Sequence, residues 1–190
     1  PSTKTPNYIF KNNQNLTFSN KQTEWGFDTP VISNGAVYAD LDNDGDLEIV
    51  TNNINDPAYV YQNKSSESGK VNYLTVQLPS SRAVNGTKVY AYCGDLQQYR
   101  AFTPTHGYES SMMTPVHFGL GTHKTVDSLV VIWPDGKMQK QTDVAANQVL
   151  KLTYSPNANW NREVVTPLFV ENKNLDFEHQ QMPVNDFSRQ

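Results

Sequence analysis

The sequence predicts an all-β protein, with an antiparallel β-sandwich or barrel-like domain that follows a shorter repeat segment. Many short stretches are rich in β-branched and aromatic residues and are bounded by Gly, Pro, Asn or Asp, which is typical of strands. The apolar fraction is only 37 %, and Tyr, Phe and Asn recur throughout, which suits short strands joined by polar turns. No segment combines helical periodicity with capping residues.

The strand signals are densest between residues 70 and 154. In chain order they are NYLTVQL, KVYAYCG, YRAFTP, VHFGLG, DSLVVIWPDGKMQKQ and QVLKLTY. The run Leu129–Trp133 is continuously apolar, as expected of a central strand that is covered on both faces, and we expect Trp133 in the core. Pro134 and Gly136 then favour a tight turn, which predicts a hairpin with the strand that follows.

Two short motifs occur twice. NYIFKNN near the N-terminus aligns with AYVYQNK, which pairs Tyr8 with Tyr59, 51 residues later. NQNLTF at 13–18 aligns with NKNLDF at 172–177. Self-similarity of this kind indicates repeats. We therefore predict three parts: a repeat segment at 1–66, the β domain at 70–154, and a linker with the start of a further repeat at 155–190.

The stretch YADLDNDGDLEIV, residues 38–50, carries a carboxylate at every second position from Asp40 to Glu48. Such carboxylates repel one another unless a cation lies among them. Oxygen ligands at the first, third, fifth, seventh and ninth positions, with Gly at the sixth, follow the logic of a Ca²⁺ loop. We therefore predict Ca²⁺ bound by the side chains of Asp40, Asp42, Asp44 and Glu48 and by the backbone carbonyl of Asp46, whose side chain should face water.

Other interpretations of this loop are weaker. An EF-hand would place its closing Glu at the twelfth position, where this chain has Thr51, and would have flanking helices. The flanks GAVYA and LEIVTN are instead rich in strand formers, so the loop should join two strands. Mg²⁺ keeps its waters and suits a cage of carboxylates less well. A solvated acidic turn without any metal is the remaining alternative.

The stretch NGAVYADLDNDGDLEIVTNN, followed by AYVYQN, closely resembles the calcium-loop repeat called FG-GAP or VCBS, which forms β-propeller blades. The next block, with NGTKVYAYCGDLQQYR, VHFGLG and VDSLVVIWPDGKMQK, resembles the ASPIC/UnbV domain, which follows such repeats in secreted proteins. Together the two resemblances cover about residues 34–154. They imply a partial propeller-blade-like repeat with a calcium loop, next to a β domain, within a larger secreted or cell-surface protein.

Composition argues against several classes of protein. The formal net charge is −4, and no Lys/Arg cluster is interleaved with aromatic residues, so we expect no nucleic-acid partner. No apolar run approaches the roughly 20 residues that span a bilayer, and the N-terminal residues lack the pattern of a signal peptide. Cys93 is the only cysteine, which excludes an internal disulfide and a thiolate zinc site.

The sequence contains no assembled catalytic set, and we expect no enzymatic activity. His117 and His123 flank FGLGT, but alternation along VHFGLG would let His117 face away from the core. Ser110 and Ser111 lack the G-x-S-x-G context of a nucleophile. Trp25 and Trp160 lie in polar surroundings and are weak candidates for stacking on a ligand such as a sugar.

The function that these features favour is a non-catalytic extracellular binding or scaffolding module with a calcium-stabilised loop. Its partner would be a protein or a glycan at a cell surface. The alternative is an accessory domain that binds or hydrolyses glycans. A third hypothesis is a purely structural spacer.

Overall fold

The computed structural model describes residues 3–80, 84–108 and 110–159, which belong to one compact unit. The predicted all-β class is confirmed, because the regular elements of these residues are strands apart from one short 3₁₀ turn. The predicted linker is described only up to residue 159. Trp160, the second NKNLDF motif and the expected start of a further repeat lie outside the described residues.

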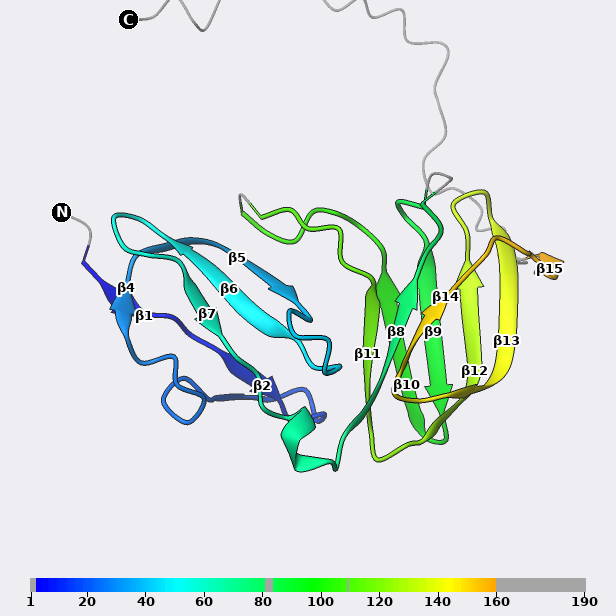
Figure 1. Ribbon diagram of the computed structural model, residues 1–190, viewed down its shortest axis with the longest axis horizontal. Coiled ribbons are helices and arrows are strands. Elements are labelled where there is room, and N and C mark those ends of the chain that lie inside the picture. Colours follow the sequence, from blue (N-terminus) through cyan, green and yellow to red (C-terminus); the bar gives the residue numbers. More distant parts are fainter. Residues whose placement is uncertain (1–2, 81–83, 109, 160–190) are drawn as a thin grey trace, which may run out of the picture. The chain divides into compact units, whose positions relative to one another are not determined.

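The β domain is built from eight strands: β8 (Asn72–Gln77), β9 (Lys88–Cys93), β10 (Leu96–Ala101), β11 (Val116–Gly121), β12 (Thr125–Ile132), β13 (Lys137–Ala145), β14 (Gln148–Lys151) and β15 (Ala158–Asn159). They form a five-stranded sheet in the order β10-β9-β12-β13-β15 and a three-stranded sheet in the order β11-β8-β14. The arrangement is consistent with the predicted sandwich (Figure 1). One pairing departs from the antiparallel prediction, since β14 runs parallel to β8.

Alternation along the strands puts apolar residues of both sheets into one core. Leu74 of β8 and Phe118 of β11 meet Val89 of β9 and Leu129 of β12, all fully buried. Trp133 follows directly after β12 and is 1 % exposed, so its predicted place in the core is confirmed. The expected hairpin is also present, with β12 paired antiparallel to β13.

The N-terminal segment has seven short strands: β1 (Thr5–Pro6), β2 (Phe10–Asn12), β3 (Phe18–Asn20), β4 (Pro30–Val31), β5 (Ser33–Ala39), β6 (Glu48–Asn53) and β7 (Tyr59–Tyr61). The last three form an antiparallel sheet in the order β5-β6-β7, whereas β1 pairs with β4 and β2 with β3. The aligned motifs around Tyr8 and Tyr59 thus each contribute a short strand, β2 and β7. The 3₁₀ turn η1 (Ser66–Ser68) follows β7 and precedes β8.

Candidate cation-binding loop and its surroundings

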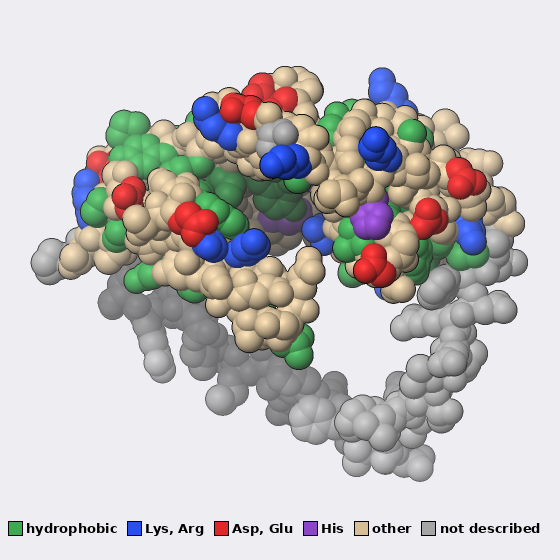
Figure 2. Space-filling view, turned by 90° about the horizontal axis from the view of Figure 1, so that it is seen from below, with side chains coloured by type: hydrophobic (Ala, Val, Ile, Leu, Met, Phe, Trp, Pro, Cys, Tyr) green, Lys and Arg blue, Asp and Glu red, His purple; other side chains and the backbone are tan. Residues whose placement is uncertain are grey.

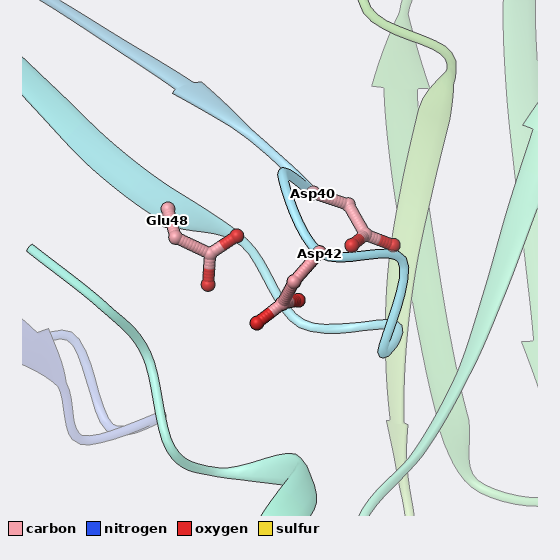
Figure 3. Close-up of side chains that lie close together, drawn as sticks. All are labelled: Asp40, Asp42 and Glu48. Carbon is pink, nitrogen blue, oxygen red and sulfur yellow. The ribbon is translucent and has the colours of Figure 1, made fainter. Parts of the chain in front are cut away.

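The acidic loop connects β5 to β6, as the strand-forming flanks predict. Asp40 and Asp42 come from the loop itself, and Glu48 is the first residue of β6 (Figure 3). One carboxylate oxygen of each of these three residues lies within 4.8 Å of the others. Asn43 and Gly45 have φ values of +61° and +91°, a backbone conformation that Asn and Gly adopt more readily than other residues. The turn residues therefore fold three predicted ligands onto one spot.

Backbone N–H groups hold two of these carboxylates in place. The N–H of Leu41 donates to Oε2 of Glu48 at 2.8 Å, and the N–H of Asn63 donates to Oε1 at 3.4 Å. The N–H of Gly45 donates to Oδ2 of Asp40 at 3.2 Å. Because Glu48 is only 3 % exposed, these bonds replace part of the hydration that its carboxylate loses.

The loop also contains buried oxygen atoms that no described group satisfies. Oδ1 of Asp40 and Oδ1 of Asp46 are inaccessible to solvent and accept no hydrogen bond within the described residues. The ion pairs in the same part of the chain involve other carboxylates: Lys4–Asp56, Lys21–Glu24 and Lys64–Glu67. A buried, unpaired carboxylate oxygen is costly without a counter-charge. The set of donors in the loop therefore fits a hard cation such as Ca²⁺.

The other two acidic residues of the loop turn toward η1. Asp44 lies outside the group of Asp40, Asp42 and Glu48, and its Oδ2 accepts a hydrogen bond from the hydroxyl of Ser66. That bond, together with one from the N–H of Asp46, lowers the pKa of Asp44. Asp44 thus anchors the loop to the segment that follows β7.

The expectation that the Asp46 side chain faces water is wrong. Asp46 is 6 % exposed, and its Oδ2 accepts hydrogen bonds from the Ser66 N–H at 2.8 Å and from the Ser65 hydroxyl at 3.2 Å. The residues after β7 pass over this side of the loop and exclude solvent from it. This contact joins residues that are about 20 positions apart in the chain, so it could not be inferred from the loop sequence alone.

The tip of the loop lies against the first strand of the β domain. A Cβ atom built on Gly45 would lie 1.9 Å from Cε1 of Tyr73 in β8. Asn147 in turn holds the backbone of Tyr73. The side-chain oxygen of Asn147 accepts a hydrogen bond from the Tyr73 N–H at 3.1 Å, and the backbone N–H of Asn147 donates to the Tyr73 carbonyl at 2.7 Å. Gly45 is thus needed for close approach to Tyr73 as well as for its positive φ.

His117 of β11 lies on the outer side of its strand, as the alternation predicts, but it is half buried. Its ring stacks on that of Tyr73 with 5.8 Å between centroids, and its Nδ1 is 3.1 Å from the hydroxyl of Thr75. Burial lowers the pKa of His117, and Arg100 adds to the decrease, whereas Asp40 and Asp46 act in the opposite direction. His117 therefore lies within electrostatic reach of the acidic loop.

Trp25, the described one of the two candidate ligand-stacking residues, is 45 % exposed. It lines a cleft of about 770 Å³ together with Phe27 and Tyr61, whose rings stack at 4.0 Å between centroids. Lys64, Gln62 and Glu24 also line this cleft. Trp25 thus has the exposed aromatic surface that its prediction requires.

These features define an all-β protein in which an acidic, cation-compatible loop packs on a β-sandwich. Residues 77–159 match the family described as ASPIC and UnbV, which confirms the resemblance for the β domain. No curated protein matches the chain. Within the described residues there is no helix of the length and apolarity needed to cross a membrane.

Proposed function

We propose that this chain is a non-catalytic binding or scaffolding module of a larger extracellular protein, and that Ca²⁺ stabilises the loop Asp40–Glu48. The observation that carries the proposal is the group formed by Asp40, Asp42 and Glu48, together with Oδ1 of Asp40, which is buried and unpaired within the described residues. Asp40, Asp42 and Glu48 would hold the ion by their side chains. Asp44 and the Asp46 carbonyl are the remaining predicted ligands.

Calcium would supply the counter-charge that lets these carboxylates remain ionised in a partly buried loop. The loop contacts η1 through Asp44 and Asp46 and contacts β8 through Gly45. An ordered loop would therefore hold the N-terminal segment against the β domain. Millimolar calcium outside cells suits a site of this kind, which supports the proposed extracellular location.

Calorimetry of the full chain in chelator and then in 1 mM calcium tests the proposal. Sites in extracellular modules bind with Kd values of about 10⁻⁴–10⁻³ M, so 1 mM calcium stabilises by roughly 0.4–1.4 kcal/mol. The melting temperature should rise by about 1–6 °C. Asp42→Asn should reduce this rise, because it removes one ligand charge while leaving an amide oxygen.

Asp143→Asn is the matched control. Asp143 is exposed on β13, and its φ of +55° is one that Asn adopts readily. This variant should keep the full response to calcium. Identical melting curves of the parent chain in chelator and calcium, with no heat of binding, would leave the loop as a solvated acidic turn and would contradict the proposal.

A second candidate function, sugar binding, rests on the cleft lined by Trp25. The exposed ring of Trp25 and the polar rim of the cleft offer the kind of surface that a neutral sugar ring would contact. Titration with neutral oligosaccharides, followed by tryptophan fluorescence, should give a saturable change that Trp25→Ala removes. A change of equal size in Trp25→Ala would exclude this cleft as its source.

A further inference from the structure

A second cleft, of about 340 Å³, is lined in part by His117 and combines cationic and polar side chains. Arg100 at the end of β10, His106 in the following loop and His117 of β11 all line it. Thr103 and Thr114 add hydroxyl groups, and Tyr38 and Phe102 add aromatic surface. None of the described residues that line the cleft is Asp or Glu.

Arg100 makes no ion pair within the described residues. Its guanidinium donates to the carbonyl of its neighbour Tyr99 at 3.0 Å, which uses a single one of five N–H groups. Arg100 is also the only arginine in the described ranges. In a chain of net charge −4, a guanidinium without a carboxylate partner, placed at a cleft, is available for an outside anion.

The two histidines are held in position by aromatic contacts. His106 meets Tyr38 edge to face at 5.7 Å between ring centroids, and His117 stacks on Tyr73. Their ring N–H groups and the two threonine hydroxyls can donate hydrogen bonds to oxyanion oxygens. The volume is at the lower end of the range for small-molecule sites and suits a ligand of about one ring.

We propose that this cleft binds the carboxylate or sulfate group of a small acidic ligand, with Arg100 as the charge partner and the two histidines and two threonines as further donors. A sugar acid and a simple free anion share this chemistry. Because Asp40 and Asp46 lie within electrostatic reach of His117, calcium in the acidic loop would strengthen anion binding, but the site does not require it. Figure 2 shows Lys and Arg side chains scattered over the face that it displays. Arg100 is the only Lys or Arg among the described residues that line the cleft, so a discrete anionic group is a better match than a polyanion.

NMR titration of the isotope-labelled full chain tests this assignment, with glucuronate, glucose, acetate and sulfate as separate probes. Glucuronate, acetate or sulfate should shift the side-chain signals of Arg100, His106 and His117, whereas glucose should not. Arg100→Gln should weaken the affinity by about tenfold or more, because it removes a charge-assisted hydrogen bond. Tighter binding of glucuronate than of acetate would identify a sugar acid, and equal binding would identify a free anion.

Lys140→Gln, on an exposed part of β13 and not among the residues that line the cleft, removes the same charge and should leave the affinity unchanged. Each titration is run in chelator and in calcium. NMR shifts that an anion causes and that Arg100→Gln weakens, in either condition, support the site whether or not the acidic loop binds calcium. The proposal is overturned if no anion shifts these signals, if Arg100→Gln and Lys140→Gln bind alike, or if glucose shifts them as well as glucuronate does. Melting curves confirm that each variant is folded.

Discussion

Gly45 lies against the aromatic ring of Tyr73, so closely that a single added carbon atom would overlap it: a Cβ at this position would lie 1.9 Å from Cε1 and 2.3 Å from Cδ1 and Cζ. Gly45 is the sixth residue of the acidic loop, and Tyr73 lies in the first strand of the β-sandwich. The ring has little room to retreat, since it stacks on His117. This contact joins the candidate cation loop to the β domain.

Gly45→Ala should destabilise the protein by at least about 2 kcal/mol, because strain at positive φ and overlap with Tyr73 add together. Gly136→Ala isolates the strain, since Gly136 also has a positive φ, +79°, but a Cβ added there would meet no atom within 4 Å. Urea unfolding of both variants measures the difference. When Tyr73 is also replaced by Ala, Gly45→Ala should lower the free energy of unfolding no more than Gly136→Ala does. A loss as large as in the presence of Tyr73 would mean that the ring is not the obstacle.

Asp46→Ala should lower the free energy of unfolding by about 1–2 kcal/mol in chelator and in calcium alike. It removes the hydrogen bonds from the Ser66 N–H and the Ser65 hydroxyl. The stabilisation by calcium should persist, because the backbone carbonyl remains. Asp28→Ala, at an exposed position, should change stability little. Equal melting temperatures for the two variants would show that the contact to η1 contributes nothing.

His117 should make stability depend on pH. Its pKa is lowered in the folded protein, chiefly by burial, below the value of 6.5 that it has when unfolded. The unfolded chain therefore binds the proton more readily than the folded protein does. The stability that neutral His117 contributes is complete above about pH 6.5 and is lost as the pH falls toward the folded pKa. Melting temperatures in chelator should decline from pH 7 to pH 5, and less steeply in His117→Gln.

The matched control for this pH profile is His123→Gln. This variant also removes one histidine of the β domain, but the histidine that stacks on Tyr73 is His117 and not His123. Its profile is the reference for removing a histidine that does not stack on Tyr73. If His117→Gln and the parent decline equally, the pH dependence arises at other groups.

Trp133→Ala should cost about 3–5 kcal/mol, as for other buried aromatic residues. The ring is 1 % exposed and meets Tyr154 edge to face at 5.3 Å between centroids. Its Nε1 has no hydrogen-bond partner within the described residues, so Trp133→Phe loses volume but no hydrogen bond and should cost clearly less. Chemical unfolding of both variants is the test, and a loss below about 1 kcal/mol for Trp133→Ala would place the ring at the surface.

Much of the β domain could be predicted from local sequence. Alternation in VHFGLG puts Phe118 in the core and His117 on the outer face, because successive side chains of a strand point to opposite sides. Pro134 and Gly136 likewise set the β12–β13 hairpin through turn geometry. The parallel pairing of β14 with β8 was not predictable in this way, since it depends on where a distant strand finds an open edge.

The acidic loop could likewise be predicted only in part. Its sequence alone determined that four carboxylates and a glycine lie between two strands and that Glu48 follows them, because spacing and strand propensity are local properties. Only the tertiary structure decided that Asp40, Asp42 and Glu48 converge while Asp44 and Asp46 bind η1, and that Gly45 meets Tyr73. It likewise brought Arg100, His106 and His117 into one cleft. These relationships join residues far apart in the chain, and no local pattern encodes them because packing sets the distances between such residues.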